Sequence, residues 1–203
     1  MTHEKPAETQ FPVHDLIRRR WSSRAFADRP VDSATLGSLL DAARWAASSN
    51  NAQPWRFLVA TKDRPEHFAA TLACLTPGNQ AWASQAPVLM LSVAQLEFDD
   101  GTKNRHAFHD VGQAAANMAI QATAMGLIIH QMAGFSVDQA RETFRIPGGY
   151  EPVAAIAVGY QGDAVGLPDR LRTRELAPRE RESLRTIVFS GGWERTADFM
   201  TQR

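Results

Sequence analysis

The sequence is poor in cysteine and has no excess of charge of either sign. Cys74 is the single cysteine among 203 residues, which excludes an intrachain disulfide and a metal site built from several thiolates. Lysine and arginine number 22, as do aspartate and glutamate, so the formal net charge is zero. Binding to nucleic acid or to an anionic membrane ordinarily needs a basic excess or stripe, so neither partner is expected.

Several familiar sequence signals are also missing. No uninterrupted apolar run approaches about 18 residues, the length of a membrane span, and the charged N-terminal region has no signal-peptide pattern. There is no G-x-G-x-x-G dinucleotide fingerprint, no G-x-x-x-x-G-K-[ST] phosphate loop and no G-x-S-x-G nucleophile elbow. These absences, together with the single cysteine, favour a soluble protein of the reducing cytoplasm.

The histidines do not predict a metal site. His106 and His109 are spaced to share one helix face, but no thiolate or H-E-x-x-H motif accompanies them. A solvated helix start is the better interpretation, and no bound metal is expected. His130 stands alone in an apolar run, which favours a hydrogen-bonded structural residue or a pocket wall over a ligand.

The apolar pattern predicts one domain over residues 1–203, with a loose polar tail at 1–10. Helices are expected at 12–20, 32–48, 65–75, 106–125 and 136–144, and strands at 56–61, 87–94, 127–132 and 152–160. The alanine-rich helix at 106–125 is expected to be central and buried. Strands alternate with helices, but several connections are too short for repeated crossovers. We therefore expect an α+β fold with a mixed, largely antiparallel central sheet flanked by helices.

Two short polar motifs point to a cofactor. Arg20-Trp21-Ser22-Ser23-Arg24 sets two cations and a hydroxyl at alternate positions, which suits a phosphate because guanidinium groups match its oxygens bidentately. Ser48-Ser49-Asn50-Asn51-Ala52-Gln53-Pro54-Trp55 is a run of small polar groups closed by Pro-Trp, which suits the hydrogen-bonding edges of a flat heterocycle. Together they predict a phosphorylated, planar cofactor.

In these residues the chain resembles the nitroreductase superfamily of FMN-dependent oxidoreductases. Residues 20–26 are similar to the family's R-x-S-x-R-x-[FY], and residues 42–57 resemble its A-A-x-x-A-P-S-x-x-N-x-Q-P-W-x-F. The stretch 130–135 is similar to a segment of one branch of the family, and 179–184 resembles its closing R-x-R-x-P-L. The resemblance extends from about residue 15 to residue 193.

The resemblance implies an FMN-binding site. Arg20 and Ser22 would hold the phosphate, Arg24 would reach the pyrimidine edge, and Asn51 would meet the imide edge. A cation at the pyrimidine stabilises the negative charge that develops there on reduction, so Arg24 would tune the flavin without being a catalytic group. The implied cofactor-binding residues are Arg20, Trp21, Ser22, Arg24, Ser48, Ser49, Asn51, Gln53, Gln131, Met132, Ala133, Gly134, Arg179 and Arg181.

Within that set, the backbone near Ala133 and Gly134 would face the reactive edge, because glycine permits close approach. Arg179 and Arg181 would close the phosphate site, with a solvated surface charge as the alternative for Arg179. The resemblance further implies a homodimer with FMN at the interface. The segment from Ala164 onward would be an arm that wraps the partner.

The implied reaction is ping-pong hydride transfer from NADH or NADPH to an electron-poor small molecule such as a nitroaromatic, quinone, enone or flavin. No side chain is expected to be catalytic, because FMN carries the chemistry. The acceptor pocket is expected in the weakly patterned segment 76–109, where Trp82, Phe98, Phe108 and His109 could line it or belong to the core.

The sequence leaves two alternatives open. The chain could be a non-catalytic module that binds or stores FMN. It could also be an oxygen-dependent or dehalogenating member of the same superfamily.

Overall fold

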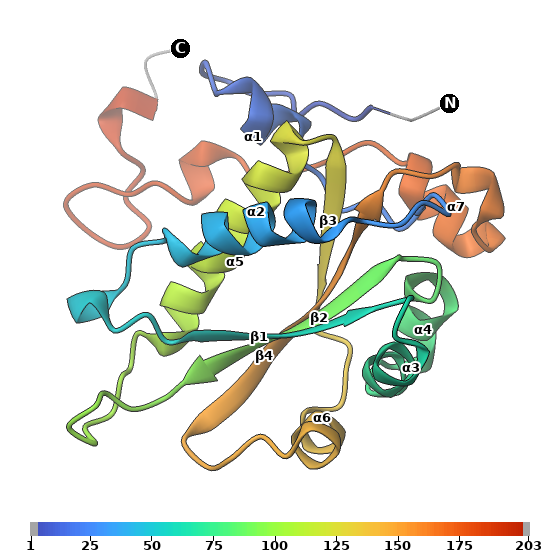
Figure 1. Cartoon of the computed structure of the whole chain (residues 1–203). Helices are drawn as coiled ribbons and strands as arrows, with labels where there is room; N and C mark the ends of the chain where they lie inside the picture. The colour runs from blue at the N-terminus through green and yellow to red at the C-terminus, as the bar shows by residue number, and fades with distance from the viewer. Residues whose placement is uncertain (1–3, 201–203) are drawn as a thin grey trace.

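A four-stranded sheet forms the centre of the molecule (Figure 1). The structure is a computed structural model, and it describes residues 4–200. Its strands are β1 (Trp55–Thr61), β2 (Val88–Gln95), β3 (Leu127–Met132) and β4 (Tyr150–Tyr160), arranged in the order β1-β2-β4-β3. The α+β class and all four strands are therefore as the sequence predicts.

Every neighbouring pair of these strands is antiparallel, so no parallel pair makes the sheet mixed within residues 4–200. Each connection between consecutive strands is long enough for a parallel crossover, but only the helix α5 (Ala107–Ala124), between β2 and β3, joins strands that run in the same direction. That crossover places β3 on the far side of β4 instead of beside β2. The two strands joined by α5 run in the same direction but do not pair.

Helices α5 and α2 (Ser33–Arg44) cover one face of the sheet (Figure 1). Residues Ala114, Ala115 and Ala122 of α5 are buried, and their small side chains permit the close approach of a central helix. The Asp32 carboxylate caps α2 by accepting the Thr35 N–H at 2.7 Å. The expected central position of the alanine-rich helix is confirmed.

The helix α2 ends at Arg44, several residues before the predicted end at residue 48. The chain beyond it is drawn toward α5, where the Asp110 carboxylate accepts the Ser49 N–H at 3.0 Å. A long-range hydrogen bond thus holds the chain after α2 against α5, outside the helix that the sequence predicts to continue there.

Three helices cover the opposite face: α3 (Pro65–Ala73), α4 (Pro77–Ala83) and α6 (Val137–Phe144). The two faces are separated by alternation along β2, which sends Val88 and Met90 into one core cluster and Leu89 and Leu91 into the other. Burial on both faces explains why this strand is continuously apolar. The sequence does not predict α4, because Pro77-Gly78 is typical of a turn; here the proline occupies the start of a helix.

The two ends of the chain lie at the same end of the molecule (Figure 1). Near the N-terminus, α1 (Asp15–Arg19) is shorter than the predicted helix at 12–20. Near the C-terminus, η2 (Ala164–Gly166) and α7 (Asp169–Leu176) pack on the body, and Leu167 joins the core. The sequence does not predict α7, because its residues are strongly polar.

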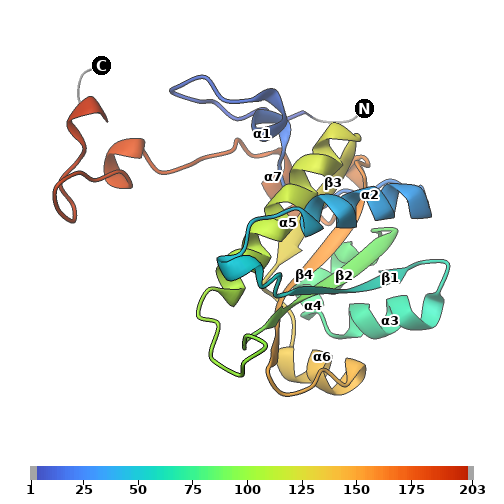
Figure 2. The same ribbon diagram turned by 60° about the vertical axis from the view of Figure 1, so that its left-hand side comes forward.

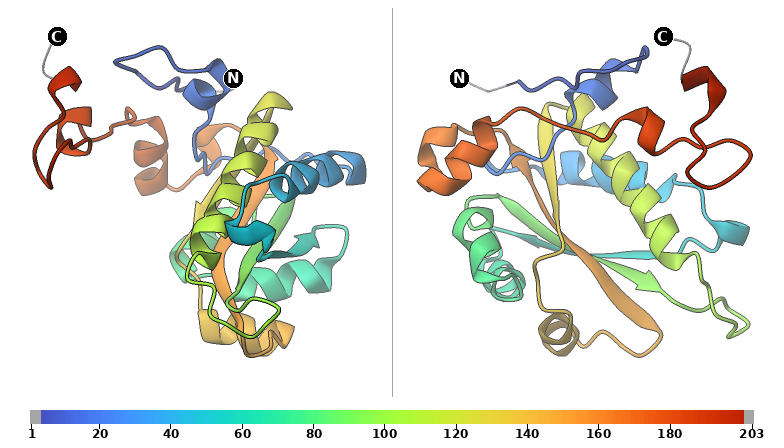
Figure 3. Two further views of the ribbon diagram at one scale, coloured as in Figure 1. Left: turned by 90° about the vertical axis from the view of Figure 1, so that its left-hand side faces the viewer. Right: turned by 180° about the vertical axis from the view of Figure 1, so that it is seen from behind.

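Beyond α7 the chain leaves the body of the molecule (Figures 2 and 3). This extended segment, residues 178–200, carries the single turns η3 (Leu184–Thr186) and η4 (Asp198–Met200). Its side chains Ile187, Trp193 and Phe199 are 57%, 85% and 63% exposed. The projecting part therefore begins later than the residue 164 expected from the sequence.

None of the helices in residues 4–200 combines the length and the apolar character that crossing a membrane would require.

Two glycines give a matched test of packing. A Cβ added at Gly162 would lie 2.5 Å from the Phe26 carbonyl, whereas a Cβ at Gly37, within α2, would meet nothing within 4 Å. We predict that Gly162→Ala lowers the free energy of unfolding by about 1–3 kcal/mol. Gly37→Ala should raise it by about 0.5–1 kcal/mol, because alanine is the better helix former. Urea denaturation measures both, and a Gly162→Ala variant as stable as the parent would contradict the packing.

Candidate functional site

The segment 20–25 lies between β3 and α7. On the β3 side, Nδ1 of His130 lies 3.1 Å from the Ser23 carbonyl oxygen. On the α7 side, the Glu175 carboxylate accepts the backbone N–H of Arg24 at 3.0 Å. Ser23 and Ala25 are buried, whereas Arg20, Ser22 and Arg24 remain partly accessible. Accessible and buried side chains thus alternate from Ser22 to Ala25, while Trp21 is partly accessible like its two neighbours.

Three arginines gather at the start of this segment. Burial, and after it the guanidinium groups of Arg179 and Arg181, lower the pKa of Arg20. Burial and Arg181 likewise lower the pKa of Arg179. Within residues 4–200, none of the three forms an ion pair with a carboxylate. Guanidinium groups that repel one another and have no ion-paired carboxylate within residues 4–200 have the charge and the donors to bind an anion.

The hydrogen bonds of the three arginines show how much of each guanidinium group is available to a ligand. Nη1 of Arg20 donates to the Ser22 hydroxyl at 3.1 Å, which places the predicted phosphate-binding hydroxyl beside the cations. Nη1 of Arg179 donates to the carbonyls of Lys5 and Arg18 at 2.7 and 2.8 Å. Part of Arg179 therefore holds the N-terminal segment in place, while the exposed Arg181 donates, within the described part of the chain, to the neighbouring Glu180 carbonyl.

Arg24 points along the same segment toward α7. Its Nη1 lies 3.8 Å from Oε2 of Glu175, and its side chain remains 26% exposed. The guanidinium carbon lies 6.0 Å from the centre of the Trp82 ring. Arg24 is thus a positioned cation with an accessible surface, as a contact to the pyrimidine edge would require.

The end of β3 is held by α4. Gln131 and Ala133 are exposed, and Met132 is buried. The Gly134 carbonyl accepts the Thr76 N–H at 3.0 Å and Nδ2 of Asn79 at 2.9 Å. A Cβ at Gly134 would lie only 2.6 Å from that Asn79 nitrogen. The close approach at this glycine is to α4 of the same chain, a reason that the sequence does not reveal.

His130 and Trp82 pack against each other beneath segment 20–25. Their ring centres are 4.6 Å apart, and Trp82 is 1% exposed within the core cluster on that face. Burial, and after it the Arg24 guanidinium, lower the pKa of His130 to about 4. His130 is therefore a neutral structural residue at physiological pH, and the structure places Trp82 in the core, where its side chain is closed to solvent.

The second motif adopts a strained conformation. Asn50, Asn51 and Gln53 have φ angles of 51°, 54° and 46°, in the left-handed region that costs free energy for residues other than glycine. The Ser48 hydroxyl accepts the Gln53 N–H at 3.1 Å and supports this turn. Asn51 is exposed, so its amide is available to a ligand. Strain of this kind is typical of binding sites.

This second motif lies at the opposite side of the sheet from α7 (Figure 1). Phe98 lines one cavity there with Asn51 and Gln53, and His109 lines another with Ser48 and Ser49. Phe108 is 49% exposed at the start of α5. Within one chain, the predicted site residues near Arg20, β3 and Arg181 therefore lie together. Those of segment 48–53 lie apart from them.

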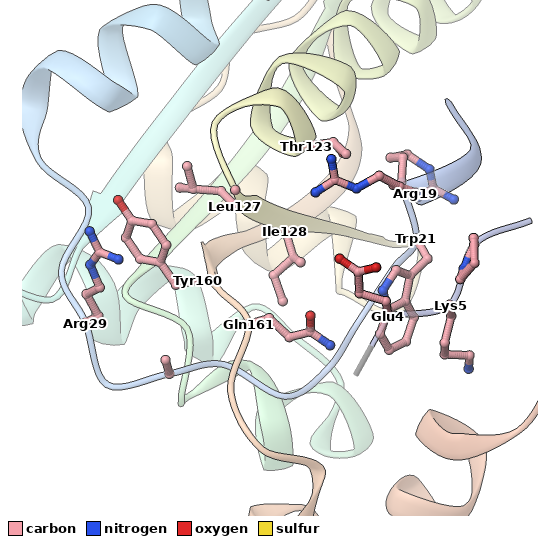
Figure 4. A pocket seen from close by; sticks show the side chains of 14 residues that line it. Glu4, Lys5, Arg19, Trp21, Arg29, Thr123, Leu127, Ile128, Tyr160 and Gln161 are labelled. Atoms are coloured by element: carbon pink, nitrogen blue, oxygen red, sulfur yellow. The ribbon is translucent and has the colours of Figure 1, made fainter. Parts of the chain in front are cut away.

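A cavity of about 380 Å³ opens beside Arg20 at the edge of β3 (Figure 4). Figure 4 shows Trp21, Lys5 and Glu4 on one side of it, with Arg29 and Tyr160 on the other. Nζ of Lys5 lies 4.6 Å from the centre of the Trp21 ring. Its walls come from distant parts of the sequence, which is why sequence patterns do not indicate it.

No group of three or more His, Cys, Asp or Glu side chains across residues 4–200 is placed to hold a metal ion.

Comparisons with known proteins identify the family to which this fold belongs. Residues 17–160 match the model of the nitroreductase family. A solved structure titled "The crystal structure of the oxidoreductase containing FMN" superposes with a TM-score of 0.89 at 35% identity, covering 97% of this chain and all of that one (100%).

Two sequence relatives are similar over most of the chain. An uncharacterized 15.4 kDa protein of Mycolicibacterium smegmatis is 35% identical over 144 residues, which cover 68% of this chain and 97% of the relative. A Stenotrophomonas maltophilia protein, whose name includes "NADH dehydrogenase/NAD(P)H nitroreductase", is 26% identical over 178 residues, covering 78% of this chain and 89% of the relative. With the family model matched over most of its length, the chain belongs to the nitroreductase family.

Proposed function

We propose that this protein is an FMN-dependent oxidoreductase that uses NADH or NADPH to reduce an electron-poor small molecule. The observation that carries the proposal is that Arg20 donates to the Ser22 hydroxyl in surroundings that it shares with Arg179 and Arg181, while none of the three arginines forms an ion pair with a carboxylate among residues 4–200. A phosphate monoester matches this donor set in charge and in hydrogen bonding. The name of the similar solved structure, which contains FMN, supports the same cofactor.

The residues of the chain would bind and orient the flavin, which when bound supplies the hydride-transfer chemistry. Arg20, Ser22 and Arg181 would hold the phosphate, with Arg179 completing the charge. Arg24, held beside Glu175, would lie along the pyrimidine edge and favour the negative charge that reduction places there.

No described side chain of this site is proposed as a proton donor. His130 is buried and neutral, with a pKa of about 4, and its ring is bonded to the Ser23 carbonyl. Protons for the acceptor would therefore come from water. Nitroaromatics, quinones, enones and free flavins are the acceptor classes that fit this chemistry, and the "NAD(P)H nitroreductase" name of the relative supports a nicotinamide donor.

We further propose that the working form is a homodimer in the cytoplasm, with the flavin at the subunit interface. Segment 48–53 lies across the sheet from α7 in the same chain, so its Asn51 amide would complete the site of a second copy. The projecting segment 178–200 exposes Ile187, Trp193 and Phe199, large apolar side chains that a partner would cover. This segment would be the arm that wraps the partner.

The absorption spectrum of the purified protein tests the flavin and its electron donor. We predict visible flavin bands that bleach under anaerobic conditions when NADH or NADPH is added, and that return when a nitroaromatic or quinone follows. Bands that persist with both nicotinamides would indicate a carrier or storage module. Reoxidation by oxygen alone, with no response to nitro compounds or quinones, would favour the oxygen-dependent alternative. A protein without flavin bands after incubation with FMN would contradict the proposal.

A double substitution tests the phosphate site. Arg20→Ala with Arg181→Ala removes two charge-assisted contacts, so we expect the FMN dissociation constant to rise about 100-fold or more. Fluorescence titration of the apoprotein measures this constant. Arg64→Ala with Arg170→Ala, which removes two exposed arginines elsewhere, is the matched control and should bind as the parent does. Stoichiometric FMN in the first double variant would show that the phosphate binds elsewhere.

A hybrid dimer tests whether two subunits share each site. One chain carries Arg20→Ala and Arg181→Ala, and the other carries Asn51→Ala. If each site combines Arg20 of one subunit with Asn51 of the other, one of the two sites in the hybrid is intact by symmetry. We predict one tight FMN site per hybrid dimer. A homodimer of either variant chain should have no tight site. A hybrid without a tight site, or a monomer by light scattering that still binds FMN tightly, would contradict sharing.

A further inference from the structure

Glu175 is an acidic residue, and it is the one residue of α7 that is fully buried. Glu175 is 2% exposed, while its neighbours on α7, Arg174 and Leu176, are exposed. A buried carboxylate costs free energy unless several hydrogen bonds replace its hydration. The partners of this carboxylate therefore show what the burial achieves.

All the hydrogen-bond donors to this carboxylate come from one short segment that lies about 150 residues earlier in the sequence. Oε1 accepts from the Ser23 hydroxyl, from the Arg24 N–H at 3.0 Å and from the Ala25 N–H at 3.4 Å. Oε2 accepts the Arg24 N–H at 3.1 Å and lies 3.8 Å from Nη1 of Arg24. The carboxylate thus determines the backbone course of residues 23–25.

The same segment is held from the other side. His130 of β3 bonds the Ser23 carbonyl, so Ser23 is bound through its side chain by α7 and through its backbone by the sheet. Ser22 and Arg24, which flank Ser23, have their backbone positions set by these bonds. Their accessible side chains are the ones assigned to the phosphate and to the pyrimidine edge.

Glu175 also connects this segment to the C-terminal arginines. Arg179 follows it by four residues and Arg181 by six, directly after the end of α7. Nζ of Lys5 donates to the Glu175 carbonyl at 2.7 Å, and Arg179 donates to the Lys5 carbonyl. The hydrogen bonds of the Glu175 side chain and of the backbone around it therefore link the N-terminal and C-terminal segments beside the three arginines.

From this geometry we infer that Glu175 is the positioning residue of the anion site, a carboxylate that holds segment 22–25 on α7 so that Arg20, Arg24 and Arg181 converge on one phosphorylated ligand. This inference rests on the proposed function for the identity of that ligand as FMN. It assigns to Glu175 no contact with the cofactor.

A purely electrostatic role would have the opposite consequence. Removing a negative charge from a cluster of cations strengthens the binding of an anion, whereas removing a positioning group weakens it. Glutamine separates the two effects. Its carbonyl oxygen can accept the Ser23 and backbone donors that Oε1 accepts, while its amide carries no charge.

The experiment compares Glu175→Ala, Glu175→Gln and Ser23→Ala with the parent. For each apoprotein, fluorescence titration gives the dissociation constants for FMN and for riboflavin, which lacks the phosphate. Hydrogen exchange, measured without any ligand, reports the protection of the Arg24 and Ala25 amides. Glu182→Ala, which removes an exposed acid beside Arg181, is the control for charge.

We expect Glu175→Ala to raise the FMN dissociation constant about tenfold or more and to reduce the preference for FMN over riboflavin. The reason is that the phosphate-binding side chains are no longer held in position relative to one another. The Arg24 and Ala25 amides should lose protection in this variant. Glu175→Gln should retain most of the affinity and of the protection, and Ser23→Ala should lie between the two. Glu182→Ala should bind FMN within about twofold of the parent.

Two results would overturn the inference. One is a Glu175→Ala variant that keeps the parent's preference for FMN over riboflavin; the other is a Glu175→Gln variant that binds FMN more tightly than the parent. If Glu175→Ala does not fold, Ser23→Ala and Glu175→Gln still decide between the two roles. A parent protein that binds neither ligand would contradict the proposed function, while the exchange of the Arg24 and Ala25 amides would still test Glu175 as an anchor.

Discussion

The capture of backbone N–H groups by the buried carboxylate of Glu175 is the interaction on which the rest of the site depends. It joins residues 23–25 to a helix near the end of the chain, and the bonds of Lys5 and Arg179 extend the same junction. Because the carboxylate binds the backbone and the inward-facing Ser23, the alternate side chains of Arg20, Ser22 and Arg24 stay available. A cluster of like charges needs such a frame, since its members repel one another until an anion binds.

The second polar motif uses the same device. Asp110, in the first turn of α5, is the other buried acidic residue in residues 4–200, and it accepts the Ser49 N–H at 3.0 Å. The turn that follows holds Asn50, Asn51 and Gln53 in left-handed conformations, which persist only when surrounding contacts impose them. Each motif is thus held through its backbone by one carboxylate on a neighbouring helix, while Ser22 and Arg24 of the first motif and Asn51 of the second remain accessible.

The division of these motifs between opposite sides of one sheet has a functional consequence. The antiparallel sheet is buried on both faces, and segments 20–25 and 48–53 lie apart in one chain. The proposed site, which uses both motifs, would therefore take one motif from each of two copies. The apolar side chains exposed on segment 178–200 are consistent with that requirement.

Much of the fold can be predicted from local sequence, because a strand or a helix depends on neighbours within a few residues. The strand at 127–132, the Asp32 cap and the alanine-rich helix are examples. Local sequence also identifies the residue types suited to a phosphate and a flavin edge. Only the tertiary structure decided that Trp82 belongs to the core, that Gly134 makes room for Asn79, and that the two motifs lie apart. Glu175 shows the reason: its partners lie about 150 residues away, and such a contact leaves no periodic signal in a polar helix.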